Sequence, residues 1–361
     1  WLLADLSSYN PPRVILDQQP VCGMCHNFSQ DGKRFIMDLD VGGDKGAFVL
    51  SPVKKHVEVT QENIISWTPF QNGGITLGLF PKISPDGKYI LATIKERSVF
   101  IKINDPRFSE LFFPFTGVLA CYSVENQKFF LLPGADQPEF VHLGPAWSPD
   151  GKYIVFSRAR VNKEFFDLMG DQGSLTAEEN IRIDDLNKKH KLRYDLYLMP
   201  FNNGRGGEPK PLAGAAHNGM SNYWPRYSPD GRWIVFTRSP NALMNQPGSE
   251  LFIVPAAGGE ARRMTCGRAG HNSWHSWSPN GRWLVFVSKV NTPYTELFLA
   301  HVDEDGQDSP PIHLRRLSSD TMASVLPEFA NIGPEDLWKI TVRWIEALGA
   351  RGPVRPAIIG P

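Results

Sequence analysis

The sequence predicts an all-β chain folded as a single β-propeller. Three observations support this: a turn-and-strand pattern that recurs five times, the spacing of its copies, and an excess of turn-forming residues. Of 361 residues, 32 are Gly and 30 are Pro, about 17 % together, against roughly 12 % in an average protein. Hydrophobic residues make up 41 % and aromatic residues 11 %, enough to fill a large core. Many short strands joined by tight turns are therefore expected.

The repeated segment begins with an aromatic or aliphatic residue and continues with Ser-Pro-Asp-Gly or a close variant. A strand of aromatic and β-branched residues follows, and a second strand pair lies downstream, as at 194–199 and 250–254. Pro presets φ, Asp or Asn tolerates left-handed conformations, and Gly supplies a positive φ, so the motif is typical of a hairpin turn. The five copies begin at Phe28, Ile83, Trp147, Tyr227 and Trp277.

The spacing of the copies indicates propeller blades. The turn residues Asp31, Asp86, Asp150, Asp230 and Asn280 are separated by 55, 64, 80 and 50 residues. A four-stranded blade takes roughly 40–50 residues, so each interval holds one blade with an insertion. The longest insertion, 164–191, is charged and is expected to include a short surface helix. Residues 1–20 and 313–332 would build at least one more blade and close the ring, which predicts six or seven four-stranded blades over residues 1–332.

Residues 333–361 differ in character and are expected to form a separate C-terminal element. Pro334 and two acids begin the segment 334–348, and Gly349 follows it, which is the punctuation of a helix. The apolar stripe of this predicted helix consists of Leu337, Trp338, Val342, Ile345 and Leu348. Such a helix would pack on the side of the propeller or dock a partner, with the Pro-rich tail 352–361 extended beyond it.

The charge balance and the missing motifs exclude several function classes. Lys and Arg total 38 and Asp and Glu total 38, so the chain lacks the basic character of a nucleic-acid binder or a polybasic membrane protein. No stretch approaches the roughly 20 apolar residues of a transmembrane segment. The chain starts at Trp1 without a leader, which predicts a mature chain after signal-peptide removal. Gly-x-Ser-x-Gly, phosphate-binding and His-Glu-x-x-His motifs are absent, so no catalytic residues are expected.

Cys22-Gly-Met-Cys25-His26 has the spacing of a covalent c-type haem site. Two thiols two residues apart add to the vinyl groups, and the adjacent His supplies the proximal nitrogen to iron. The alternatives are a Cys22–Cys25 disulfide and a reduced pair without a cofactor. His26 lies two residues before Phe28, so the motif is placed at the entry to an inner strand, near the central channel.

His275 occupies the repeat position of His26, so the two are expected at the same end of the channel. It is a candidate for a distal haem ligand, or for a metal ligand alongside His26. The alternative is a hydrogen-bonded His that replaces Pro at a channel mouth, which is the commoner role for a lone His. Weaker candidates for a sixth ligand are Met24, Met220 and His217. Cys121 and Cys266 are expected in blade strands, with their pairing left open.

The five copies resemble the WD-like repeat of the TolB-type β-propeller family over residues 22–312. The stretch from Cys22 to Gly32 is similar to a branch of that family that has Cys-x-x-Cys-His-x-Phe-Ser-x-Asp-Gly in its first blade, and 272–281 also resembles that branch. The resemblance implies a periplasmic scaffold that binds protein partners at a channel mouth. It also implies a place beside a cytochrome or a multihaem redox enzyme, as in the hydrazine synthase complex.

The leading hypothesis is a non-catalytic propeller subunit of a periplasmic redox complex. Cys22, Cys25 and His26 would form its haem or disulfide site at the channel mouth. One alternative is a stand-alone c-type haem electron-transfer protein. Another is a plain adaptor for protein partners in which the Cys pair is a disulfide. A propeller fold serves many functions, so the site has to decide between them.

Overall fold

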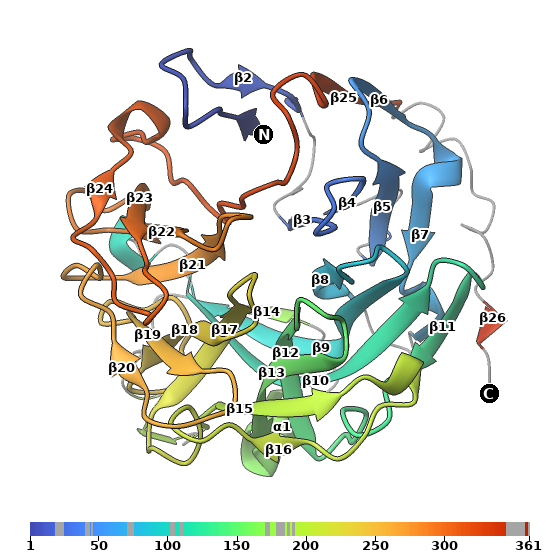
Figure 1. The fold of residues 1–361 in the computed structure, drawn as a ribbon. Coiled ribbons are helices and arrows are strands. Elements are labelled where there is room, and N and C mark those ends of the chain that lie inside the picture. The colour runs from blue at the N-terminus through green and yellow to red at the C-terminus, as the bar shows by residue number, and fades with distance from the viewer. Residues whose placement is uncertain are drawn as a thin grey trace.

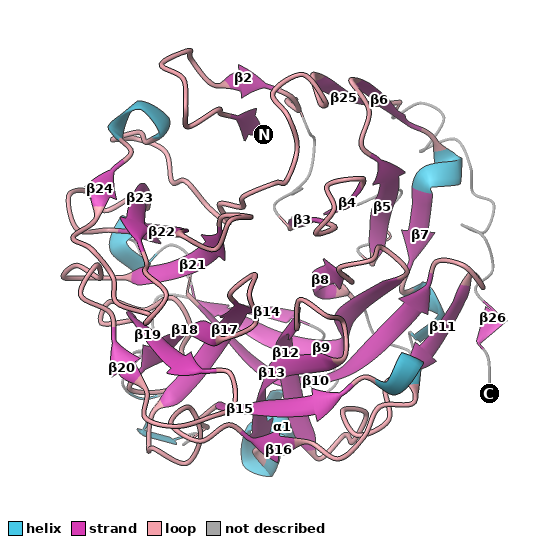
Figure 2. Cartoon of the chain, viewed as in Figure 1, coloured by secondary structure: helices cyan, strands magenta, loops and turns pink. Residues whose placement is uncertain are grey.

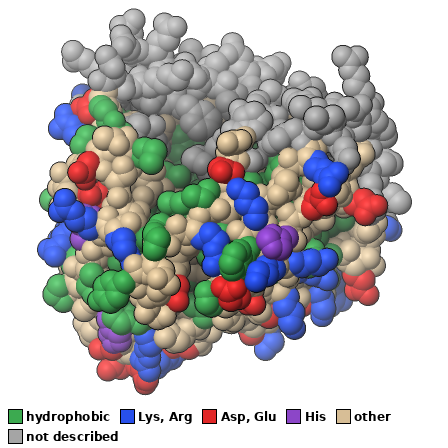
Figure 3. Space-filling view, turned by 90° about the horizontal axis from the view of Figure 1, so that it is seen from above, with side chains coloured by type: hydrophobic (Ala, Val, Ile, Leu, Met, Phe, Trp, Pro, Cys, Tyr) green, Lys and Arg blue, Asp and Glu red, His purple; other side chains and the backbone are tan. Residues whose placement is uncertain are grey.

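The computed structural model is built almost entirely from strands arranged around a central axis (Figures 1 and 2). It describes residues 1–18, 25–39, 44, 46–70, 76–101, 105–108, 111–169, 174–177, 185, 188–189, 192–343 and 358–359. The prediction of an all-β chain is confirmed. Charged side chains of both signs are interspersed on the face seen in Figure 3, as expected for a chain of zero net charge. No described helix is long and apolar enough to cross a membrane.

Five four-stranded units follow one another around the axis, each an antiparallel meander. The second and third units in chain order are joined into one larger sheet by a single parallel pairing position, Gly117–Val141. The units are β3 (His26–Phe28), β4 (Arg34–Asp38), β5 (Ala47–Pro52) and β7 (Ile64–Ser66); β8 (Leu79–Ile83), β9 (Tyr89–Ile101), β10 (Phe112–Ser123) and β11 (Lys128–Leu131); β12 (Phe140–Trp147), β13 (Tyr153–Arg160), β15 (Asp195–Pro200) and β16 (Lys210–Pro211); β17 (Ser221–Tyr227), β18 (Trp233–Ser239), β19 (Glu250–Pro255) and β20 (Arg262–Arg263); and β21 (Asn272–Trp277), β22 (Trp283–Ser288), β23 (Glu296–His301) and β24 (Ile312–His313).

The remaining elements are short and lie outside these units. The long insertion after β13 contains the predicted short helix and a strand, β14 (Ser174–Ala177), that pairs in parallel with β9. The remaining strands are β1 (Leu2–Leu3), β2 (Arg13–Val14), β6 (His56–Val59), β14 (Ser174–Ala177), β25 (Lys339–Val342) and β26 (Ile358–Ile359). The helices are α1 (Lys163–Met169) and the 3-10 turns Gln61–Asn63, Thr68–Phe70, Pro106–Phe108, Asn202–Gly204 and Arg315–Leu317.

The repeated turn has the same construction in all five units. The Ser hydroxyl donates to the Asp or Asn side chain two residues on at 2.5–2.7 Å, and the glycine that follows has a φ between +69° and +74°. The same side-chain oxygen accepts the backbone N–H of the residue after the glycine. Both bonds lie within one turn, which is why the sequence alone predicts it.

The two chain ends fill the arc between the fifth unit and the first. β1 pairs with β2, and β25 pairs in parallel with β6, next to the first unit (Figure 1). Among the described residues these two-stranded pieces stand where a sixth four-stranded blade is predicted. The blade count of six or seven and full closure of the ring therefore stay predictions.

The helix predicted over 334–348 is wrong for its described part, because Lys339–Val342 form the strand β25. Leu337 and Ile340 are buried with the first unit's core, at 0 % and 1 % exposure, while Trp338 and Thr341 face outward. The free edge of β6 offers four parallel pairing positions, and tertiary pairing overrides a local helical pattern. Ile345, Leu348 and the start of the predicted tail lie outside the described residues.

Gly32→Ala is expected to destabilise the protein by about 1–3 kcal/mol more than Gly151→Ala, as measured by urea unfolding. Both glycines have a φ near +70° in the same turn, so the backbone strain of alanine is matched. At Gly32, however, a Cβ would lie 1.9 Å from the carbonyl oxygen of Asn331, whereas at Gly151 the nearest atom is 4.0 Å away. If both variants lost the same free energy of unfolding, the residues near Asn331 would not pack on the first unit.

Candidate binding site in the central channel

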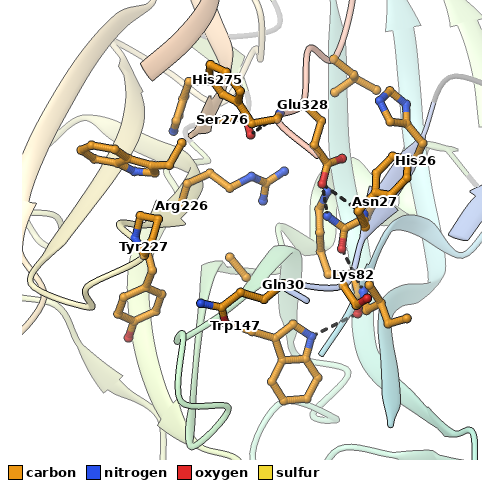
Figure 4. A pocket seen from close by; sticks show the side chains of 18 of the residues that line it. His26, Asn27, Gln30, Lys82, Trp147, Arg226, Tyr227, His275, Ser276 and Glu328 are labelled. Carbon is orange, nitrogen blue, oxygen red and sulfur yellow. Dashed lines mark hydrogen bonds between the residues drawn. The ribbon is translucent and has the colours of Figure 1, made fainter. Parts of the chain in front are cut away.

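A cavity of about 300 Å³ lies on the axis of the ring, lined by the innermost strand of each of the five units (Figure 4). Strands β3, β8, β12, β17 and β21 each contribute two or more lining residues, and the repeated turns and the C-terminal segment 326–331 add others. A volume of this size is at the lower end of small-molecule sites in proteins. It is therefore the candidate functional site of the chain.

A bulge shapes the wall in four of the five inner strands. The residue three positions before the repeat's first residue has a positive φ in each: 54° at Phe80, 59° at Gly144, 54° at Trp224 and 41° at Trp274. The pairing register shifts at each of these points. Three of these residues are aromatic and strained in this conformation, and such strain concentrates at functional sites. Bulges also re-aim the side chains that follow them.

Next to the bulge is a ring of mainly polar residues, one from each unit: Asn27, Lys82, Ala146, Arg226 and Ser276. Figure 4 shows the guanidinium of Arg226 extending into the cavity, with Lys82 and Asn27 across from it. The C-terminal segment adds the carboxylate of Glu328. The inner strands thus place two cations and the C-terminal segment one anion around a single space.

Glu328 is held by the first unit. Its Oε1 accepts hydrogen bonds from the side-chain amide of Asn27 and from the backbone N–H of Phe28, the latter at 3.2 Å. Asn27 in turn accepts the N–H of Ile83 at 3.0 Å through its Oδ1. Across the cavity, Phe329 donates its N–H to the hydroxyl of Ser276 at 3.2 Å. The C-terminal segment is therefore bonded to the first and fifth units on opposite sides of the site.

The two cations lie in a poorly solvated space. Burial and, to a smaller extent, the charge of Arg226 lower the pKa of Lys82 to about 8, against the raising effects of Glu328, Cys25 and Asp38. Burial also lowers the pKa of Arg226, which Glu328 and Cys25 partly offset. Among the described carboxylates, none forms an ion pair with either cation. The cavity therefore carries a net positive charge at neutral pH.

The rest of the wall is apolar and aromatic. Trp147 is fixed by a hydrogen bond from its Nε1 to the carbonyl oxygen of Lys82 at 3.0 Å. On the bulge side, Phe80 packs edge-on against Trp224, with ring centroids 4.3 Å apart. The other apolar lining residues include Phe28, Ile83, Tyr227, Trp277 and four turn prolines. The site can therefore hold a ligand with a charged end and an apolar body.

Of the predicted haem ligands, Cys25 and His26 line this cavity and Cys22 lies outside the described residues. The imidazole of His26 packs against the indole of Trp1, with centroids 4.5 Å apart. The carbonyl oxygen of Cys25 accepts the N–H of Asp38 at 2.9 Å, which ties the motif to β4. Burial raises the pKa of Asp38 to about 7.

His275 lines the same cavity as His26 and is 3 % exposed. Its Nε2 is 3.0 Å from the carbonyl oxygen of Val235, so this nitrogen carries the proton and donates it. Its Nδ1 is buried without a hydrogen-bond partner in the described structure. Burial lowers the pKa of His275 to about 3, so the ring is neutral and Nδ1 has a free lone pair.

The other candidates stand away from the cavity or outside the described residues. Met220 and His217 are not among its lining residues, and His217 contacts Asp195 instead, at 3.2 Å between Nδ1 and Oδ2. Met24 lies outside the described residues. Cys121 and Cys266 are buried in different core clusters and form no disulfide, so a bond between them is excluded. The prediction that Cys266 lies in a blade strand is wrong, because this residue lies in a turn.

No group of three or more His, Cys, Asp or Glu that could hold a metal ion occurs within the described ranges. The metal site predicted at His26 and His275 would need further ligands and stays a prediction. Cys25 and His26, two of the three residues of the predicted haem site, line the cavity, and haem attachment stays a prediction.

Sequence reasoning missed Lys82, Arg226 and Glu328. A signal for the first two was present, because they occupy the same position of the repeat, directly before its first residue. Glu328 had no such signal, since it lies outside the repeats and reaches the cavity only through the path of the C-terminal segment.

No protein-family model and no curated protein sequence matches the chain. Similar solved structures include TolB from Acinetobacter baumannii (17 % identity, TM-score 0.48, 85 % of this chain and 57 % of that one covered). An oligogalacturonate lyase from Vibrio parahaemolyticus is 14 % identical, with a TM-score of 0.48 and coverage of 86 % and 71 %. Hydrazine synthase from Kuenenia stuttgartiensis is 14 % identical, with a TM-score of 0.39 and coverage of 82 % and 80 %. The chain thus spans 57 % of the length of the first of these.

Proposed function

We propose that this chain is a non-catalytic binding propeller of a periplasmic redox complex, with a c-type haem at Cys22, Cys25 and His26. The observation that carries the proposal is the position of Cys25 and His26 on the wall of the axial cavity. A haem there would adjoin the cavity to which all five described units contribute. The channel mouth would then present the haem to a cytochrome or a redox-enzyme partner.

Each residue of the proposed haem site would have a separate role. Cys22 and Cys25 would hold the haem covalently, and His26 would supply the proximal nitrogen. When bound, the haem supplies one-electron transfer. The packing of Trp1 orients the ring of His26. His275 lines the same cavity and would be the candidate for a second imidazole ligand.

The protein expressed with a periplasmic haem-attachment system is expected to show a Soret band and an intact mass raised by one haem. The matched control is Cys22→Ser/Cys25→Ser, which is expected to be colourless and of unmodified mass. A colourless wild-type protein would reject the haem. Thiol titration before and after reduction would then identify the disulfide-containing adaptor.

Membership of a complex is tested separately from the haem. Wild-type protein and the double Ser variant, both tagged, would be isolated from the native periplasm and their co-purifying proteins compared. A redox subunit retained by both variants supports a scaffold. A subunit lost with the haem supports the stand-alone electron carrier that meets its partner through the cofactor.

A further inference from the structure

We propose that Lys82 and Arg226 form a carboxylate-binding site on the axis of the ring. The inference does not depend on the proposed haem, because both residues come from β8 and β17 rather than from the Cys22–His26 segment. It names the ligand chemistry of the cavity: a small organic anion with an apolar body.

The first step is the charge of the cavity. Two cations and one carboxylate line it, which leaves an excess of positive charge in a space with little solvent. Like charges brought together out of water are costly unless an anion joins them. A bound carboxylate would remove this cost, and the field between Lys82 and Arg226 would favour it.

The second step is that Glu328 does not neutralise the cations directly. Its Oε1 is engaged by Asn27 and Phe28, so the carboxylate is held on the β3 side of the cavity. The described contact of the Arg226 guanidinium is a 3.4 Å one to the carbonyl of Pro225, its own neighbour. Most of its five N–H donors are therefore available, in the fork geometry that fits a carboxylate.

The third step is the apolar wall, which selects the body of the ligand. Trp147, Tyr227 and Trp277 surround the charged ring, and the prolines of four turns line the opening beyond them. The cavity of about 300 Å³ fits one small molecule rather than a folded partner.

One carboxylate chemistry has two possible sources here: a propionate of a haem held at Cys25, or a free organic acid that enters the channel. Haem-free protein separates them, because only a free acid can fill the site there. The probe is benzoate, which combines a carboxylate with an aromatic body. Benzamide has the same shape without the charge and is the matched control ligand.

The experiment titrates full-length Cys22→Ser/Cys25→Ser protein with benzoate and follows binding by calorimetry and tryptophan fluorescence. Saturable binding of benzoate, with benzamide at least about 10-fold weaker, is expected. In this background R226Q and K82M should each weaken benzoate by about 10- to 100-fold, since each removes a charged hydrogen-bond donor. R232Q and K152M, at exposed positions on the repeated turns, should leave the affinity for benzoate unchanged.

Glu328→Gln supplies a test of opposite sign. Gln keeps the acceptor for Asn27 and Phe28 and removes the competing negative charge, so benzoate should bind more tightly. Benzoate affinity should also fall as the pH rises through about 8, because Lys82 loses its proton. Ionisation of Asp38 above pH 7 acts in the same direction, while Arg226 stays charged and Glu328 opposes the loss of the Lys82 proton.

The outcomes separate the alternatives. Benzoate binding in haem-free protein that is absent from haem-loaded protein assigns the site to the propionates. Equal binding in both assigns it to a free acid. No saturable benzoate binding to folded haem-free protein, or equal binding of benzamide, overturns the site. A colourless wild-type protein that binds benzoate would reject only the haem.

Discussion

Deletion of residues 334–361 is expected to lower the free energy of unfolding by about 3–6 kcal/mol, a large share of a typical total. The deletion removes Leu337 and Ile340, each buried almost completely in the core of the first unit. It also removes the pairing of β25 with β6. Urea unfolding followed by tryptophan fluorescence measures the loss.

Point variants exclude a general effect of truncation. Leu337→Ala should cost about 2–5 kcal/mol, as expected for a Leu without accessible surface. Leu2→Ala is the matched control, because this Leu is 61 % exposed and should change stability by less than about 0.5 kcal/mol. If the truncated protein unfolded at the same urea concentration as the full chain, residues 334–343 would be a docking element only, as the sequence alone suggests.

Stability is expected to be greatest at about pH 6.5 and to fall on both sides. Burial lowers the pKa of His142, His271 and His275 to about 3 each, so only the unfolded chain takes up these protons below pH 6.5. Burial raises the pKa of Glu96 to about 8 and of Asp38 to about 7, so the folded chain alone keeps these protons above pH 4.5. Each unmatched proton changes stability by about 1.4 kcal/mol per pH unit.

The curve of stability against pH has an acid limb below pH 6.5 and an alkaline limb above it. The direction of each limb follows from the difference in the number of protons bound by the unfolded and the folded chain. Between pH 6.5 and 4.5 three histidines oppose two acids, and stability falls slowly as the pH is lowered. Below about pH 4 the unfolded acids are protonated too, all three histidines act, and the loss steepens to about 4 kcal/mol per pH unit. Above pH 6.5 the two acids alone remain, and stability falls until about pH 8. Urea unfolding midpoints from pH 3.5 to 8.5 trace this curve.

Two variants assign the limbs to particular groups. Glu96→Gln should flatten the alkaline limb, whereas Glu125→Gln, at an exposed turn, should not. Gln keeps an acceptor for the N–H of Gly78, which donates to Glu96 at 3.1 Å. His271→Gln should make the acid limb less steep, with exposed His56→Gln as its control. An alkaline limb that is the same in Glu96→Gln and wild type would contradict the assignment.

The C-terminal segment links the fold to the site. It contributes residues 326–331 to the cavity wall and, a few residues later, the buried pair Leu337 and Ile340 to the first unit. The same segment that completes the core therefore positions Glu328 beside the cations. Loss of β25 is expected to loosen the carboxylate site as well as the first unit.

The five turns, their inner strands and the all-β class are predictable from the sequence. The reason is physical: each turn is closed by hydrogen bonds between residues at most five positions apart, such as Ser148 to Asp150, and its glycine takes a positive φ. The repeat also placed His26 and His275 at equivalent positions, and both line one cavity. Lys82 and Arg226 could have been found in the same way.

The conformation of the chain ends depends on tertiary contacts. Residues 334–343 have the punctuation and apolar spacing of a helix, yet the free edge of β6 and the core around Val57 and Val59 draw them into a strand. Glu328 lies about 300 residues from Asn27 and Phe28, whose donors hold it. Pairing over such a separation depends on the path of the whole ring, and no local pattern records it.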